Sequence, residues 1–155
     1  MTAEMSARSA SLHLTQKSAR GFGAPLVAVA SVVLVRVVGW QGSDVPAQLY
    51  RVMLFRSSGF ALWDTHWYGG HALLSYSILY PALGAALGVY GAAALAAGVA
   101  AWSFDRIMSE EFGTSSWLAS AMFVSAVAVP VIVGQFAFLC GEASALLVTR
   151  PTTSS

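Results

Sequence analysis

The stretch that decides the fold is Ala72–Phe104, ALLSYSILYPALGAALGVYGAAALAAGVAAWSF, which contains no acidic or basic residue. As one helix it would extend about 50 Å at about 1.5 Å per residue, well beyond the roughly 30 Å of a bilayer core. Its length therefore favours two crossings, near Leu73–Tyr90 and Gly91–Ile107. Gly88 and Gly91 flank Val89-Tyr90, where the chain would make a tight reversal. A single tilted helix kinked at Pro81 is the alternative.

An earlier apolar stretch, Gly21–Trp40, matches the thickness of one bilayer core and contains a single charged residue, Arg36. Arg36 is close enough to Trp40 for its guanidinium to reach the membrane interface, where tryptophan is favoured. A cleaved signal peptide is the competing interpretation. The length of the stretch and the absence of a small-x-small cleavage site after it favour an uncleaved crossing.

The third apolar stretch, Trp117–Cys140, contains no charged residue. It predicts either one tilted crossing or a helix that breaks at Gly134-Gln135. In the second case Phe136–Val148 forms a further hydrophobic segment, which at about 20 Å is short for a crossing.

The composition agrees with a chain that is solvated by lipid. Hydrophobic residues make up 57% of the sequence and charged residues 10%, against about 25% charged in a soluble domain. These values disfavour a soluble enzyme and a disordered chain, and a net charge of +1 disfavours nucleic-acid binding. Cys140 is the sole cysteine, which excludes an internal disulfide. We therefore predict an all-α, polytopic membrane protein with about four spans (three to five) and an outer amphipathic helix at the interface.

The expected organisation has three parts. Residues 1–20 form a flexible cytoplasmic head, residues 21–148 form the transmembrane helical domain with an outer segment at 41–71, and residues 149–155 form a polar tail. The basic residues of the head favour a cytoplasmic N-terminus in a multi-pass protein of the cell membrane. The loop Asp105–Ser116 is then expected outside.

The outer segment opens with an expected interfacial helix. Ser43–Pro46 has the pattern of a helix start, with Ser43 or Asp44 as the cap and proline in the first turn. Ser57–Gly59 ends the helix. The apolar positions expected to share one side are Leu49, Val52, Met53 and Phe60.

Three ionisable residues of this helix are candidates for a site. Arg51 and Arg56 lie off its expected apolar side. Either the helix merely rests on lipid, or Arg51 or Arg56 also contacts a lipid phosphate through its guanidinium. Asp44 follows the exit of the first crossing. Its carboxylate can act as a helix cap, a general base or a metal ligand.

An aromatic segment follows, Trp63–His71, WDTHWYGGH. Its aromatic side chains either anchor the segment at the membrane interface or line a pocket for a sugar or lipid headgroup. The spacing lacks the helical i, i+4 histidine pair of metalloproteases, so the metal signal is weak. We assign no cofactor, although a divalent cation stays open. The candidate substrate-binding residues here are Trp63, Asp64, His66, Trp67, Tyr68 and His71.

Four groups of residues carry a resemblance to a known family. They are Asp44 with Gln48–Arg51, Gly59–Asp64, Trp67–His71, and Tyr76-Ser77 with Tyr80-Pro81. This array resembles actinobacterial multi-spanning membrane proteins, which are similar to the polytopic C-type glycosyltransferases that use polyprenyl-phosphate sugars. The resemblance implies that Asp44 acts as a base or metal-associated carboxylate on the acceptor hydroxyl, and that the aromatic segment shapes an outward cavity. Since that superfamily usually has eight or more spans, it also implies an N-terminal portion or a shortened relative.

Two functions compete at this point. In a transferase, Asp44 would accept the proton of the attacking hydroxyl, while Arg51 or Arg56 would stabilise the departing phosphate of the lipid-linked donor. In a non-enzymatic accessory or small transporter-like protein, Gly84-x-x-x-Gly88 would support packing within the chain or against partner membrane helices. Glu142, which is charged within an apolar segment, is the clue to transport.

Overall fold

The computed structural model describes residues 22–60, 63–64, 73–74 and 77–149. Across these residues the protein is all-α apart from one two-residue ladder, in which β1 pairs with β2 in antiparallel orientation. The helices are Phe22–Val38, α2 (Val45–Ser58), α3 (Leu79–Leu87), α4 (Val89–Phe112), α5 (Trp117–Val133) and α6 (Phe136–Val148), with a 3-10 turn η1 (Gly113–Ser116) and strands β1 (Trp63–Asp64) and β2 (Leu73–Leu74).

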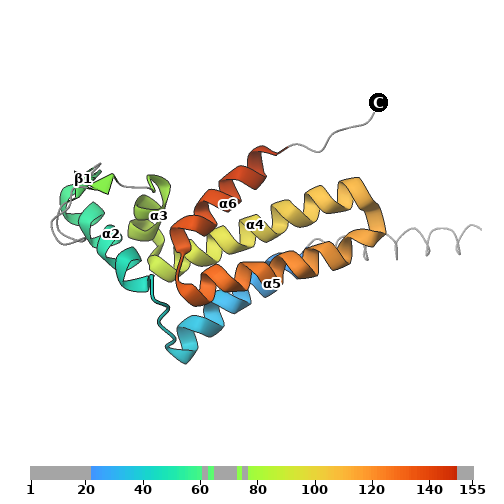
Figure 1. Cartoon of the computed structure of the whole chain (residues 1–155), viewed down its shortest axis with the longest axis horizontal. Helices are drawn as coiled ribbons and strands as arrows, with labels where there is room; N and C mark the ends of the chain where they lie inside the picture. Colours follow the sequence, from blue (N-terminus) through green and yellow to red (C-terminus); the bar gives the residue numbers. More distant parts are fainter. Residues whose placement is uncertain (1–21, 61–62, 65–72, 75–76, 150–155) are drawn as a thin grey trace, which may run out of the picture.

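Helix Phe22–Val38, α4, α5 and α6 form a bundle in which consecutive helices run in opposite directions (Figure 1). Two contacts define one end, which we call the junction end. Trp40 Nε1 donates a hydrogen bond to the carbonyl of Ile132 at 2.9 Å, and the rings of Tyr90 and Phe136 meet edge to face. At the opposite end, the loop end, η1 joins α4 to α5. The helices α2 and α3 lie at the junction end (Figure 1).

The helix α4 forms the centre of the bundle because small side chains cover its buried face. Alanine has little side chain, so neighbouring helices approach its backbone closely. A Cβ added at Gly98 would lie 3.0 Å from Val29 Cγ2, which shows how near the first helix comes. The buried alanines of α4 are Ala92, Ala93, Ala96, Ala97, Ala100 and Ala101.

Glycines break both long apolar stretches. Gly88, with φ of 79°, separates α3 from α4, and these two helices are bent by 117°. A crossing over Leu73–Tyr90 is therefore wrong, since α3 begins at Leu79 and spans only about 13 Å. The single helix kinked at Pro81 is also wrong, because Pro81 lies in the first turn of α3, where proline is tolerated.

The structure also differs from the loop expected over Asp105–Ser116, and it decides between the two alternatives for Trp117–Cys140. The expected loop Asp105–Ser116 is helical, because α4 continues to Phe112 and only η1 separates it from α5. Gly134 takes a left-handed conformation and ends α5. The break at this glycine is thus confirmed, and a single crossing over Trp117–Cys140 is wrong.

The lengths of the described helices can be compared with the length that a membrane crossing requires. Among the described helices, none alone combines the length and apolar character of a membrane crossing. The bent pair α3 and α4 meets that standard when its two parts are taken together.

The bounds expected for α2 are confirmed. Leu49, Val52 and Met53 share one side of it as expected, but Arg56 shares that side too, and only Val52 of the three apolar residues is buried. The buried residues are Val45, Gln48 and Val52, whereas Leu49 and Met53 are exposed. The physical reason is close packing on α3, where a Cβ added at Gly84 would lie 2.5 Å from Val52 Cγ2. Gly84 therefore serves packing within the chain. Phe60 beyond the helix is also exposed.

Candidate functional site

The backbone around Asp44 is held by the last turn of α5. Carbonyl groups at a helix end have no partner within the helix. The Asp44 N–H donates to the Val133 carbonyl at 3.0 Å, and the Trp40 indole donates to the neighbouring carbonyl of Ile132. Because Gly42 lies directly against the Val133 carbonyl, a side chain there would collide with it. The end of α5 therefore fixes the segment that carries Asp44.

The carboxylate of Asp44 does not make the expected helix cap. Asp44 occupies the N-cap position of α2, yet its side chain makes no capping hydrogen bond. The Ser43 hydroxyl donates to Asp44 Oδ1 at 3.4 Å, and Asp44 is half-buried. A half-buried carboxylate at the end of a bundle, not used as a cap, is compatible with the roles of base or cation ligand.

A groove of about 570 Å³ runs along α2 at the junction end, a size in the range of pockets for small organic ligands. One wall is a stripe of α2 made by Val45, Leu49, Val52, Met53 and Arg56. The other walls come from the α3–α4 bend and the end of the first helix. Their residues are Gly84, Leu87, Gly88, Val89, Tyr90 and Gly91, and Arg36, Gly39 and Gln41.

Two arginines reach this groove from different helices. The Arg36 guanidinium carbon lies 5.4 Å from the centre of the Tyr90 ring, in the geometry of a cation–π contact. Arg56 Nη2 donates to the Ala85 carbonyl at 2.9 Å. Among the described residues that line the groove there is no aspartate or glutamate. The groove therefore combines apolar walls with positive charge.

Sequence reasoning did not assign Arg36 to a site. A signal is present in the sequence, since Arg36 is the sole charge within Gly21–Trp40, but its distance from Trp40 predicts only an interfacial residue. The aromatic partner that holds its guanidinium at the groove, Tyr90, is distant in sequence and could not be inferred from spacing.

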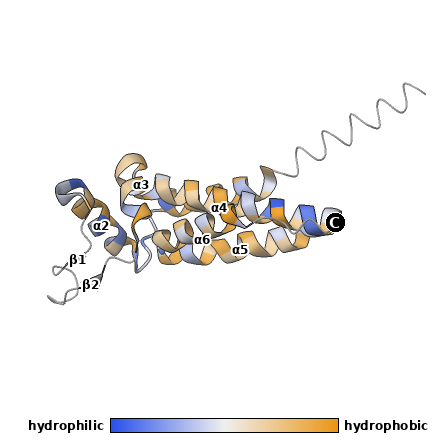
Figure 2. Cartoon of the chain, turned by 90° about the horizontal axis from the view of Figure 1, so that it is seen from above, coloured by the Kyte–Doolittle hydropathy of each residue, from blue (hydrophilic) through white to orange (hydrophobic). Residues whose placement is uncertain are grey.

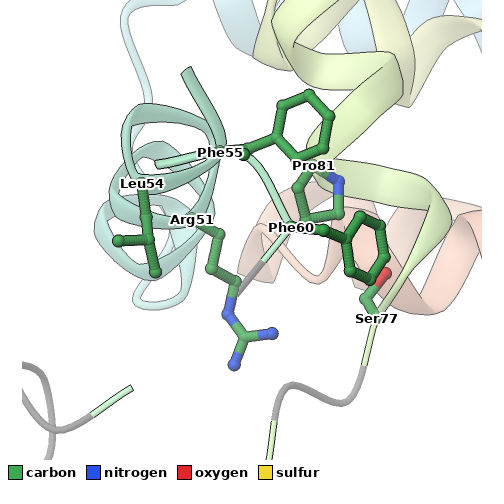
Figure 3. A pocket seen from close by; sticks show the side chains of 7 residues that line it. Arg51, Leu54, Phe55, Phe60, Ser77 and Pro81 are labelled. Carbon is green, nitrogen blue, oxygen red and sulfur yellow. The ribbon is translucent and has the colours of Figure 1, made fainter. Parts of the chain in front are cut away.

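Arg51 lies apart from the groove, in a small cleft that Figure 3 shows between α2 and the start of α3. The cleft has a volume of about 30 Å³, which is about the volume of one water molecule in the liquid. Phe55 and Phe60, whose rings meet edge to face at 6.1 Å, form part of its wall. Arg51 and Arg56 thus line separate hollows, and of the two only Arg56 shares its hollow with Arg36.

The aromatic segment is described only at its margins. Trp63 is 65% exposed and pairs with Leu74 across the two-residue ladder. His66, Trp67, Tyr68 and His71 lie outside the described residues, as does the side chain of Asp64. Within the described ranges, no group of three histidine, cysteine, aspartate or glutamate side chains is placed to share a metal ion.

The structure thus places the three candidates of α2 in different surroundings. Asp44 does not line the groove, although Gln41 and Val45 on either side of it do. Asp44 and Arg56 are separated by about 18 Å along the helix at 1.5 Å per residue. One reacting centre cannot touch both side chains at once.

Comparison of the chain with known protein families, with curated proteins and with solved structures finds no match. The class defined by the described residues is an all-α bundle with a positively charged groove at one end.

Proposed function

We propose that this protein is an integral, multi-pass protein of the cell membrane whose junction end lies at the outer face. The observation that carries this proposal is the exposure of large apolar side chains on all four bundle helices. Examples are Val37 at 78%, Trp117 at 69% and Phe138 at 62% exposure. In water such surfaces would associate, whereas in lipid they are solvated. Figure 2 shows hydrophobic residues along the bundle and hydrophilic ones toward its ends.

The proposed crossings are the four bundle helices. Helix α4 extends about 36 Å, while α5 and Phe22–Val38 each extend about 26 Å, close to the bilayer core. Helix α6 reaches about 20 Å and packs against α4. The short helices α2 and α3 then lie at the outer interface instead of crossing.

The distribution of basic residues favours this orientation. The head carries Arg8, Lys17 and Arg20 directly before the first helix, which runs toward the junction end. Arg150 follows α6, which runs from the junction end back toward the loop end and finishes beside Trp102–Ile107 of α4. Arg106 lies near that end on α4. Because cytoplasmic flanks are enriched in lysine and arginine, the loop end with the N-terminus is proposed to be cytoplasmic. This proposal replaces the outer location expected for Asp105–Ser116, because α4 and not Leu73–Tyr90 is the second proposed crossing.

Cysteine accessibility in intact cells tests this topology. Cys140 is buried, so Cys140→Ala provides the background for two single-cysteine variants at exposed positions, Ser58→Cys on α2 and Ser115→Cys in η1. A membrane-impermeant maleimide should label the first in intact cells and the second only after permeabilisation. Release of the chain by alkaline carbonate, or equal labelling of both positions in intact cells, would refute the proposal.

For the chemistry, we propose an N-terminal portion or shortened relative of a glycosyltransferase that takes sugar from a polyprenyl-phosphate donor at the outer face. Support comes from the position of Asp44, a half-buried carboxylate at the junction end that is not used as a cap. In the reaction, the acceptor hydroxyl oxygen forms a bond to the anomeric carbon with inversion. The bond between the anomeric carbon and the phosphate oxygen breaks, so that polyprenyl phosphate leaves, and Asp44 takes the proton of the hydroxyl.

A glycosyl-transfer assay with metabolically labelled cells tests the role of Asp44. Asp44→Asn should abolish transfer, because the asparagine side chain has nearly the same shape as aspartate but does not accept the proton. Glu110→Gln at the loop end is the matched control and should retain transfer. Equal transfer by Asp44→Asn and the unchanged protein would exclude Asp44 as the base.

A non-enzymatic accessory or transporter-like protein is the second candidate. The observation in its favour is Glu142, a half-buried carboxylate on α6 among apolar residues. Ionisable residues within membrane segments often serve transport. Proton-dependent uptake in vesicles that is lost in Glu142→Gln, together with unchanged behaviour of Asp44→Asn, would favour this function over glycosyl transfer.

A further inference from the structure

We propose that the groove along α2 binds the phosphate group of an anionic lipid through Arg36 and Arg56, with the apolar part of that lipid along the groove walls. This inference rests on the proposed location in a membrane, and it deepens that function by naming a ligand class and the residues that hold it. Neither the glycosyl-transfer role of Asp44 nor the identity of a sugar is needed for it.

The first argument is the charge of the groove. Arg36 and Arg56 both line it, and none of the other described lining residues is acidic. Two cations that share a concave apolar wall with no carboxylate create a positive potential. Arginine suits phosphate in such a place, because its planar group donates several hydrogen bonds and is weakly hydrated.

The second argument is that both guanidinium groups are held by the same element, the α3–α4 bend. Arg56 donates one hydrogen bond to Ala85 in the last turns of α3, and Arg36 lies over Tyr90 in the first turn of α4. A guanidinium carries five donors, so a single bond to a carbonyl leaves donors for a ligand. The bend therefore orients both cations before any ligand arrives.

The third argument is the shape and surroundings of the groove. Its apolar lining includes Leu49, Met53 and Leu87, all of which are exposed. A water-soluble anion would leave these side chains without a partner, whereas an acyl or prenyl chain would cover them. The combination of a cationic site and an apolar trough selects a phosphate with an attached hydrocarbon chain.

Native mass spectrometry of the full chain, purified in a non-ionic detergent, tests the proposal by titration with defined lipids. The probes are phosphatidylglycerol, a polyprenyl monophosphate and phosphatidylcholine. We expect retention of at least one anionic lipid and weak retention of phosphatidylcholine. Retention of the polyprenyl phosphate alone identifies it as the source, and retention of both anionic lipids identifies a general lipid phosphate. Equal retention of phosphatidylcholine would overturn the proposal.

Arginine variants locate the site. Arg36→Gln and Arg56→Gln should each weaken retention roughly tenfold, and the double variant should lose it. Arg106→Gln is the matched control, because Arg106 is exposed at the far part of α4 and pairs with Glu110. Equal retention by all three single variants, or equal loss by all three, would overturn the assignment.

A second pair of variants leaves the charges unchanged. Leu49→Trp places a bulky ring in the groove and should reduce retention, whereas Leu95→Trp, at a comparably exposed position on α4, should not. Lipid binding is measured in detergent, so an error in the proposed membrane topology would show only in the cysteine-labelling experiment. An error in the proposed lipid site would show only in this lipid titration.

Discussion

Replacing Gly134 with alanine should destabilise the junction end. Gly134 has φ of 89°, where an L-residue costs about 1–2 kcal/mol. An added Cβ would lie 2.6 Å from Val45 Cγ2 and 2.8 Å from the Val45 backbone nitrogen. Since backbone cannot yield as a flexible side chain does, we add about 1–3 kcal/mol for overpacking.

The combined cost of about 2–5 kcal/mol corresponds to a fall in melting temperature of about 4–20 °C for a chain of this size. Circular dichroism of the purified chain in detergent, followed through the helix signal, measures it. Gly141→Ala on α6 is the matched control, because a Cβ there has no neighbour within 4 Å. That change should be neutral or stabilise by up to about 1 kcal/mol.

Equal melting temperatures for Gly134→Ala and the unchanged protein would refute the close approach of α5 to the start of α2. The same result would remove the argument that the end of α5 positions Asp44. A fall in both variants would instead point to a general sensitivity of the helices to added methyl groups.

Three further changes test single hydrogen bonds and ion pairs of the protein by the same melting measurement. Trp40→Phe removes the indole donor to Ile132 and should cost about 0.5–1.5 kcal/mol; no loss would show that this bond does not hold the junction end. Ser120→Ala removes a 2.6 Å hydrogen bond to Asp105 and should cost about 1.5–3 kcal/mol, whereas the control Ser125→Ala, which loses a bond within α5, should cost less. Arg106→Gln breaks an exposed i, i+4 pair with Glu110 and should change stability by about 0.5 kcal/mol or less; a larger loss would disqualify it as the control for the groove.

Local signals predicted the breaks of the chain well. Gly59 ends α2, and Gly134 ends α5, as their glycine identity and flanking residues indicated. These features depend on backbone conformations that are available to glycine within a few residues. The start of α2 was also predictable from a local signal, because a proline suits the first turn of a helix.

Features that depend on tertiary packing were not predictable from spacing. Gln48 is buried and Leu49 is exposed, although their polarity predicts the opposite. The reason is that α2 packs with Val45, Gln48 and Val52 inward, and Val52 meets α3 at Gly84. The length rule assigned a crossing to Leu73–Tyr90, since an uncharged stretch does not reveal that its first residues form a strand. Arg36 gained a candidate role only when its partner Tyr90 was placed beside it.

The two proposals meet at one end of the groove. Gln41 and Val45 flank Asp44 and line the groove together with Arg36 and Gly39, whereas Arg56 lies at the opposite end of α2. If Asp44 serves a sugar carried on the bound lipid phosphate, the sugar must extend from that phosphate toward the Arg36 end of the groove. Arg36→Gln should then lower glycosyl transfer more than Arg56→Gln, even where both weaken lipid retention equally. Equal loss of transfer in the two variants would separate the lipid site from the chemistry of Asp44.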